Sequence, residues 1–390
     1  MNGAQSLVRT LVANGVDTCF ANPGTSEMHF VAALDEIPGM RCVLGLFEGV
    51  VSGAADGYAR ITGKPAAVLM HCGPGLANGL AGLHNAARAR SPILNFVGDL
   101  ATYHRALNPP LARDTESLAS IVSPWVRKVN SADAVGAVAA EAIEICRGQP
   151  PQVATVVLPS DVCWSEGGKV AVASPPIPPK TVSENAIREV GTLLRSGEPC
   201  LLILGGRALR ADGIALAHRL SAKTGVHYRA EQFNALIERG RGRIPIDRIS
   251  YRLDQGLAEL ANYRHIILVE AEEPVAFFAY PGKPTTMVPP GCVVHELTKI
   301  SEDSIDALNR VADLVGARAV SPGITPVPQW DTASTDELSP SGIASVLGTT
   351  IPENAIVVDE SMTFGRNEWF KFTCDAERHE SRPDRKSAPG

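Results

Sequence analysis

Residues 43–60 read VLGLFEGVVSGAADGYAR, an apolar run that passes through Glu48 into a segment rich in glycine and alanine. The run at 43–46 predicts a buried strand, and the small residues at 48–62 predict a helix that packs closely against its neighbours. The same alternation continues along the first half of the chain. Further strands are expected at 18–20, 66–70, 93–97 and 153–158, and further helices at 5–13 and 76–90. Buried strands separated by helices predict an α/β fold with a doubly wound parallel sheet.

The second half of the chain repeats this alternation, with strands expected at 201–204 and 266–270 and a helix at 211–224. It predicts a second doubly wound α/β domain. A helix at 341–347 and a strand at 355–359 begin the pattern a third time, and a polar, charged segment without periodicity follows. We therefore expect a first domain at 1–172, a proline-rich linker at 173–183, a central domain at 184–320, a second linker at 321–340, the start of a third domain at 341–366 and a disordered tail at 367–390.

Composition and charge exclude several classes of protein. The 390 residues hold 36 basic and 42 acidic side chains, a net charge of −6 without a basic stripe, so no nucleic-acid partner is expected. No apolar run approaches the roughly 18 residues of a membrane span, and no secretory signal opens the chain. We expect a cytoplasmic protein. The eight cysteines form no C-x-x-C pair and are expected to be reduced and structural.

Glu48 is the first candidate for chemistry, because it stands between an apolar run and a helix of small residues. A carboxyl group removed from water there is equipped to exchange protons near neutral pH. Alternatively, Glu48 is only a first-turn carboxylate that the helix dipole favours.

Two loops that follow predicted strands are the next candidates. FANPGTSE at 20–27 sets a tight turn after which Thr25 or Ser26 could cap a helix, with Glu27 in its first turn. HCGPGLAN at 71–78 places His71 and several glycines at the carboxyl end of a strand, where open α/β sheets bind ligands. Each loop, taken alone, is also compatible with an ordinary turn and a histidine of no special role. A Gly-Gly-Arg turn at 205–207 is only half of a dinucleotide fingerprint.

Together, the order and content of these segments resemble the pyrimidine-binding domain of thiamine diphosphate enzymes. The matching stretches are 20–27, 47–60 with its GAADGYAR ending, 71–78 and 86–98, and the likeness extends to about residue 365. The sequence is similar to acetolactate synthase large subunits and to benzoylformate decarboxylase. The resemblance implies a thiamine diphosphate-dependent 2-oxo acid decarboxylase or carboligase of the acetolactate synthase type, with benzoylformate-type decarboxylation as the alternative.

The resemblance also implies roles for individual residues. The family's glutamate matching Glu48 bonds the aminopyrimidine ring and promotes the imino form that deprotonates the thiazolium carbon. Pro23, Gly24 and Asn78 match residues that line the pyrimidine pocket. Thr25 and His71 match groups that benzoylformate decarboxylase turns toward its substrate, so Glu48 and His71 are the predicted catalytic residues.

The remaining family features are cofactors and partners. Family members form homodimers or homotetramers, and their third domain carries a Gly-Asp-Gly segment whose magnesium ion holds the cofactor diphosphate. This sequence contains no Gly-Asp-Gly segment, so no metal ligand is predicted. A non-catalytic remnant that lacks the magnesium–diphosphate site is therefore a further alternative. The central domain binds FAD in some members, and no residue here indicates that it does so in this chain.

Overall fold

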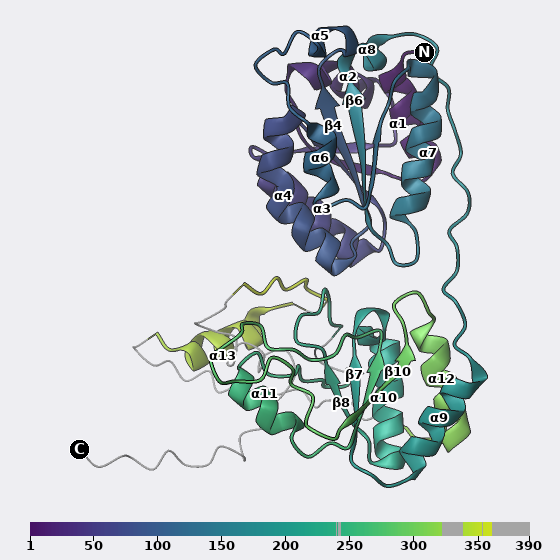
Figure 1. The fold of residues 1–390 in the computed structure, drawn as a ribbon, viewed down its shortest axis with the longest axis vertical. Coiled ribbons are helices and arrows are strands. Elements are labelled where there is room, and N and C mark those ends of the chain that lie inside the picture. Colours follow the sequence, from purple (N-terminus) through teal and green to yellow (C-terminus); the bar gives the residue numbers. More distant parts are fainter. Residues whose placement is uncertain (239, 241–242, 322–337, 353, 361–390) are drawn as a thin grey trace. The chain divides into compact units, whose positions relative to one another are not determined.

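The computed structural model describes residues 1–238, 240, 243–321, 338–352 and 354–360 (Figure 1). The chain divides into two compact units, Met1–Pro179 and Lys180–Gly390. The expected tail at 367–390 lies outside the described residues, as does most of the expected linker at 321–340. Among the described residues, none of the helices combines the length and the apolar character that a membrane span requires.

The first unit is built on a six-stranded sheet in which every neighbouring pair of strands is parallel, in the order β2-β1-β3-β4-β6-β5. Its strands are β1 (Thr18–Asn22), β2 (Arg41–Leu44), β3 (Ala66–Met70), β4 (Ile93–Asp99), β5 (Trp125–Lys128) and β6 (Val153–Pro159). The predicted parallel α/β fold is confirmed.

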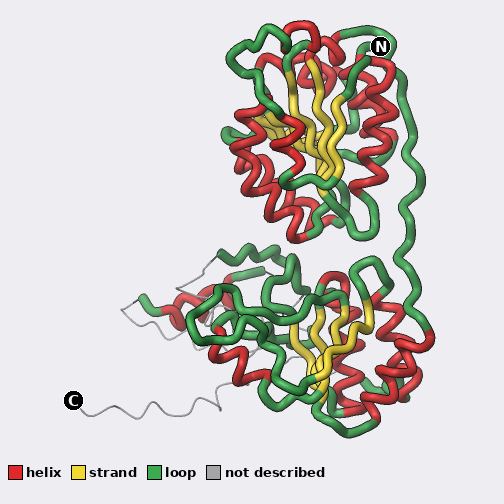
Figure 2. Tube along the Cα trace, viewed as in Figure 1, coloured by secondary structure: helices red, strands yellow, loops and turns green. Residues whose placement is uncertain are grey.

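Helices cover both faces of this sheet, and Figure 2 shows the strands between the two helical layers. They are α1 (Gly3–Ala13), α2 (Met28–Glu36), α3 (Glu48–Thr62), α4 (Cys72–Ala89), α5 (Thr102–Arg105), α6 (Thr115–Ser120), α7 (Val135–Cys146) and α8 (Ser160–Trp164). Strand β3 explains the unbroken apolar sequence of a central strand: Leu69 packs into the core beneath α1 and α7, whereas Val68 and Met70 pack beneath α3 and α4.

The second unit holds a four-stranded parallel sheet in the order β10-β9-β7-β8. Its strands are β7 (Cys200–Leu204), β8 (His227–Ala230), β9 (His265–Val269) and β10 (Val293–Thr298), and its helices are α9 (Glu184–Arg195), α10 (Ala211–Thr224), α11 (Leu253–Leu260), α12 (Ser304–Val315) and α13 (Pro340–Thr350). The second α/β unit expected from the sequence is present.

Two strand predictions are wrong in detail. The segment 355–359 is not a strand: no described strand pairs with it, and the side chains of Ile356 and Val358 are 63% and 88% exposed. The strand expected at 43–46 ends at Leu44 and is not buried, because β2 is an edge strand that pairs only with β1. Leu44 and Leu46 are 67% and 90% exposed.

The GAADGYAR segment anchors α3 to the rest of the unit. Buried Asp56 accepts hydrogen bonds from the Arg60 guanidinium and from the Ser91 hydroxyl at 2.5 Å. Two residues further along the helix, the Tyr58 hydroxyl donates a hydrogen bond to the Asp17 carboxylate at 2.6 Å. The hydrogen bond from Tyr58, together with Lys64 at 3.0 Å, lowers the pKa of Asp17 to about 2. These three motif residues therefore hold the helix that begins with Glu48.

The Tyr58–Asp17 hydrogen bond predicts a pH effect. Because the pKa of Asp17 is lower in the folded state than in the unfolded chain, about 3.9, Asp17 stabilises the fold above that value and less as pH falls toward 2. Tyr58→Phe is expected to raise the pKa of Asp17 and to shift acid unfolding to higher pH, measured by NMR titration of the carboxyl carbons. Tyr103→Phe, at a 71% exposed position, is the control. An unchanged Asp17 titration in Tyr58→Phe would show that the hydroxyl does not hold this carboxylate.

Candidate active site

The site lies at the carboxyl edge of the first sheet, where β1 and β3 end side by side. Asn22 and Met70 are partners in the parallel ladder, so the loops that follow them begin next to each other. One loop carries Pro23 and Gly24, and the other begins at His71. The topology thus brings together two segments that lie nearly 50 residues apart in the sequence.

Glu27 links the two loops, although the sequence suggested for it no more than a place in a helical first turn. Its side chain is buried, and its Oε2 atom lies 2.8 Å from His71 Nδ1 and accepts the Gly24 N–H at 2.8 Å. The expected hydroxyl cap is wrong. Thr25 and Ser26 lie in a 3-10 turn, Thr25–Glu27, that has no side-chain cap, and the Glu27 carboxylate satisfies the Gly24 amide instead.

Two glycines make room for this arrangement. A Cβ added to Gly24 would lie 2.4 Å from His71 Nδ1, so only glycine lets the histidine ring approach the turn so closely. A Cβ added to Gly98 in β4 would lie 1.6 Å from Glu27 Oε1. The positions of the Glu27 and His71 side chains therefore require glycine both at Gly24, after β1, and at Gly98, near the end of β4.

Cys72 closes the same cluster. Its backbone is left-handed, with φ of 48°, its thiol contacts the Ser26 hydroxyl at 3.4 Å, and its side chain is buried. Burial raises the pKa of Cys72 to about 12. The Ser26 hydrogen bond offsets part of this rise, and the negative charge of Glu27 adds to it. Donor atoms of Glu27, His71 and Cys72 all lie within 4.8 Å of one another, a spacing that could hold a metal ion. The protonated thiol makes it a poor ligand at neutral pH.

Glu48 begins α3 and is 6% exposed. Asn78 Nδ2 of α4 donates a hydrogen bond to Glu48 Oε2 at 3.0 Å, and α3 packs on α4 along their length. The burial predicted for Glu48 is present, but its cause differs from the prediction. The preceding residues Leu46 and Phe47 are exposed, and it is α4 that covers the carboxylate.

Glu48 and His71 both lie next to Gly75 of α4. A Cβ added to Gly75 would lie 2.8 Å from Glu48 Oε1 and 3.4 Å from His71 Cβ, so both side chains border this glycine. The structure thus gathers Glu48, Asn78, His71 and Gly24 around the two loops. Thr25 is exposed in the adjoining turn, and Pro23 is half-buried just before Gly24.

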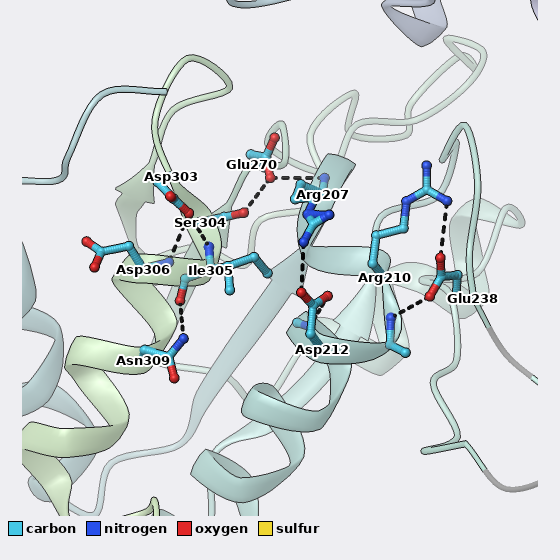
Figure 3. A network of polar contacts seen from close by, with 12 residues as sticks. Arg207, Arg210, Asp212, Glu238, Glu270, Asp303, Ser304, Ile305, Asp306 and Asn309 are labelled. Carbon is cyan, nitrogen blue, oxygen red and sulfur yellow. Dashed lines mark hydrogen bonds and ion pairs between the residues drawn. The ribbon is translucent and has the colours of Figure 1, made fainter. Parts of the chain in front are cut away.

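A second polar network lies at the carboxyl edge of the sheet in the second unit (Figure 3). Glu270, with φ of 52°, follows β9 and accepts hydrogen bonds from the Arg207 amide at 3.0 Å and the Ser304 hydroxyl at 2.6 Å. Glu238 accepts the Ala211 amide, which begins α10, at 3.0 Å. Asp303 accepts the amides of the first turn of α12. The chain's own carboxylates therefore accept the amides of Arg207, Ala211, Ile305 and Asp306, which could otherwise bind an anion at this edge.

Comparison with known proteins identifies the family. Residues 1–118 match the model of the thiamine pyrophosphate enzyme N-terminal TPP binding domain; thiamine pyrophosphate is thiamine diphosphate. IlvX of Mycobacterium tuberculosis, named as an acetolactate synthase large subunit, is 49% identical over 366 residues, which are 94% of this chain and 70% of that protein. Benzoylformate decarboxylase of Pseudomonas aeruginosa is 29% identical over 54% of this chain and 40% of its own length.

A solved structure supports the fold. The thiamine diphosphate-dependent 4-hydroxybenzoylformate decarboxylase of Rhodococcus jostii superposes with a TM-score of 0.76 at 21% identity, covering 96% of this chain and 73% of that one. The fold, the family model and the similarity to IlvX over 94% of this chain agree with one another. The chain belongs to the thiamine diphosphate enzymes, in the group similar to acetolactate synthase large subunits.

Proposed function

We propose that this chain provides the pyrimidine-binding part of a site that decarboxylates a 2-oxo acid with thiamine diphosphate. One observation carries the proposal: the buried Glu48 carboxylate is held on one oxygen by Asn78, while its other oxygen lies so close to Gly75 that a Cβ there would be 2.8 Å away. A carboxylate buried in this way is suited to share a proton with a ring nitrogen.

The residues present fit the cofactor. Pro23 and Gly24 follow β1, and Asn78 bonds Glu48. These residues would hold the pyrimidine ring, with Glu48 Oε1 as its hydrogen-bond partner. Thiamine diphosphate, when bound, supplies an electron sink for the carbon–carbon bond that is broken. The part of the chain that the structure describes offers no Gly-Asp-Gly segment for a magnesium ion, so the proposal for metal and diphosphate binding rests on the family resemblance alone.

His71 is proposed to exchange a proton with the substrate. A carboxylate can only accept hydrogen bonds, so the contact with Glu27 places a proton on His71 Nδ1. The other ring nitrogen, Nε2, is then the atom that accepts or delivers a proton. Glu27 acts as a positioning residue, because it fixes both the ring orientation and the tautomer. Thr25, exposed in the next turn, is proposed to face the substrate.

The proposed substrate class is the 2-oxo acids, and the products decide between the two reactions considered. A nearby proton source favours release of an aldehyde, as in benzoylformate-type decarboxylation, whereas coupling to a second 2-oxo acid gives acetolactate-type carboligation. Carbon dioxide release from pyruvate and from benzoylformate, with thiamine diphosphate and Mg²⁺, tests the proposal, and NMR of the products identifies aldehyde or hydroxyketone. No cofactor-dependent carbon dioxide from any 2-oxo acid tried would contradict an enzymatic role and favour the non-catalytic alternative.

The second unit is proposed to bind no FAD. The phosphates of a dinucleotide need backbone amides at the carboxyl edge of a parallel sheet. Here Glu270, Glu238 and Asp303 already accept those amides, and their negative charges would repel a diphosphate (Figure 3). A flavin absorption band in the purified protein that persists through gel filtration would contradict this proposal.

A self-association surface is proposed beside Glu48. Leu44, Leu46, Phe47 and Val50 are 67%, 90%, 49% and 60% exposed, an apolar cluster that water does not favour. Its proximity to the site agrees with the homodimer or homotetramer that the family resemblance implies.

The surface predicts the effect of one substitution. Leu46→Asp is expected to shift the protein toward the monomer by at least tenfold in dissociation constant, because a charge would be buried in an apolar contact. Analytical ultracentrifugation measures the shift. Val172→Asp, at a position 77% exposed elsewhere in the same unit, is the control. If both variants associate as the unaltered chain does, this surface is not the interface.

A further inference from the structure

Basic side chains gather beyond the end of β4, around the loop 100–114 that leads through α5 to α6 (Figure 1). Asp99 ends β4, and its carboxylate accepts hydrogen bonds from Arg105 and, at 3.1 Å, from Lys128. The Asp99 side chain is 3% exposed, whereas those of Arg105 and Lys128 are 25% and 18% exposed. A single buried carboxylate therefore holds two positively charged side chains next to the candidate site.

Arg113 adds a third positive charge to this loop. Its carbonyl oxygen accepts a hydrogen bond from Arg105 Nη2 at 2.7 Å, so the Arg105 side chain links buried Asp99 to the backbone of Arg113. The exposed Arg113 guanidinium donates one hydrogen bond, to the Ala112 carbonyl at 2.7 Å, although a guanidinium has five N–H groups. Among the described residues, no carboxylate forms an ion pair with Arg113. Its charge is therefore available to a ligand.

The carboxylates beside Arg113 and at the candidate site have other partners. Asp114 accepts hydrogen bonds from the Ser117 amide at 3.0 Å and from the Ser117 hydroxyl at 2.7 Å, and it caps α6. These hydrogen bonds lower the pKa of Asp114, so it stays ionised and bound to Ser117 near neutral pH. Buried Glu27 is held in the same way by Gly24 and His71. Neither carboxylate therefore neutralises Arg113.

The Arg113 side chain lies against the first turn of α4, the helix that begins after His71. A Cβ added to Gly73 would lie 3.3 Å from Arg113 Cβ and 3.7 Å from its Cγ. In the same turn, Gly75 borders Glu48 Oε1 and the Cβ atom of His71. Residues two apart face different sides of a helix, so Arg113 and Glu48 flank the turn from two sides. A substrate that reacts near His71 can therefore extend toward the Arg113 guanidinium.

The chemistry of decarboxylation decides which carboxylate suits this cation. The carboxylate that leaves as carbon dioxide loses its negative charge in the transition state. A cation bound to that group would stabilise the substrate more than the transition state and so oppose the reaction. A second carboxylate at the far end of the substrate keeps its charge throughout, and a guanidinium binds a carboxylate through two parallel N–H···O bonds. The cation therefore favours a substrate with two carboxylates.

We propose that Arg113 binds the far carboxylate of a dicarboxylic 2-oxo acid. The inference rests on the proposed function, because it narrows the substrate class of that same site. Arg105 is a positioning residue, since it joins the Arg113 carbonyl to buried Asp99 and so fixes the backbone from which the Arg113 side chain extends. Lys128, bound to the same carboxylate, adds positive charge that favours an anion.

Equilibrium binding tests the inference without requiring turnover. The ligands compared are 2-oxoglutarate and 2-oxopentanoate, which has the same carbon chain with a methyl group in place of the far carboxylate. Saturation-transfer NMR of the whole chain with thiamine diphosphate and Mg²⁺ follows the methylene protons of each acid, whose signals differ from those of a product. We expect 2-oxoglutarate to bind about tenfold more tightly or better, the usual effect of hydrogen bonds between charged groups.

Substitutions of Arg113 assign this preference to one side chain. Arg113→Gln should bring the ratio of the two dissociation constants close to one, whereas Arg113→Lys keeps the charge without the paired N–H groups and should give an intermediate ratio. Arg88→Gln is the matched control, because Arg88 is exposed in the last turn of the same helix and its loss changes the net charge equally. It should bind both acids as the unaltered chain does. Circular dichroism verifies that each variant is folded.

The outcomes separate this inference from the proposed reaction. An unchanged ratio in folded Arg113→Gln, no preference for 2-oxoglutarate in the unaltered chain, or no binding of either acid would overturn the inference. Carbon dioxide release from pyruvate in that case would leave the proposed function in place. A preference that depends on Arg113, without carbon dioxide release from any 2-oxo acid, would support the carboxylate site and contradict the proposed reaction.

Discussion

Glu48→Gln is expected to lower the turnover of a 2-oxo acid by about 10²- to 10⁴-fold, the usual contribution of a positioned proton-transfer group. Glutamine fills the same space and still accepts the hydrogen bond from Asn78, so the start of α3 and its packing against Gly75 of α4 should persist. What is lost is the ability to share a proton with the ring nitrogen of the cofactor. Rates of carbon dioxide release under saturating thiamine diphosphate measure the change.

Glu116→Gln is the matched control for this substitution. Glu116 is also a first-turn carboxylate, in α6, but it is exposed and lies outside the candidate site. Its replacement alters the helix end without altering the chemistry, so turnover should stay within about twofold. Equal rates for Glu48→Gln and Glu116→Gln would mean that Glu48 is only a favoured helix-end charge.

Gly98→Ala is the second prediction with a large expected effect. The added Cβ would lie 1.6 Å from Oε1 of the buried Glu27 side chain, so the carboxylate must move and lose its contacts with Gly24 and His71. Overfilling a packed interior costs about 1–3 kcal/mol of unfolding free energy. Hydrogen exchange of the amides of β3 and β4 reports this loss in the first unit alone, and the pH dependence of turnover reports the freed His71 ring.

Two variants make the Gly98 result specific. Gly53→Ala adds the same methyl group in α3, where nothing lies within 4 Å of it, and should leave exchange and turnover unchanged or slightly improved. Adding Glu27→Asp to Gly98→Ala shortens the side chain that the new methyl group meets, and it should restore part of the stability lost in Gly98→Ala. If the single variant Gly98→Ala protects the β3 and β4 amides from hydrogen exchange as well as the unaltered chain does, the position of Glu27 does not depend on glycine in β4.

The sequence allowed the fold to be predicted where apolar runs were long. Central strands such as β3 are buried on both faces, and their uninterrupted apolar sequence marks them. Edge strands were harder, because one row of their side chains meets solvent. The short β5 reads Trp-Val-Arg-Lys and was not predicted, and the apolar segment 355–359 was predicted as a strand although it has no described strand to pair with.

Site residues that belong to a sequence motif could be predicted, whereas contacts that form only when the chain folds could not. Glu48, His71 and Asn78 were found through their motifs, and their catalytic and binding roles stay predictions. Glu27 was passed over as a first-turn charge, although its position three residues after Gly24 is the spacing of a reciprocal helix cap. The contact between Arg113 and Gly73 had no sequence signal, since only the fold brings their two loops together.

The most direct measurement of the central claim does not require the substrate to be known. In heavy water, the proton on the thiazolium carbon of thiamine diphosphate exchanges for deuterium at a rate that quenched-flow NMR records. With Mg²⁺ and this chain, exchange is predicted to be much faster than for the free cofactor, and Glu48→Gln is predicted to remove most of that acceleration. Exchange that is equally fast with Glu48→Gln would contradict the role assigned to Glu48.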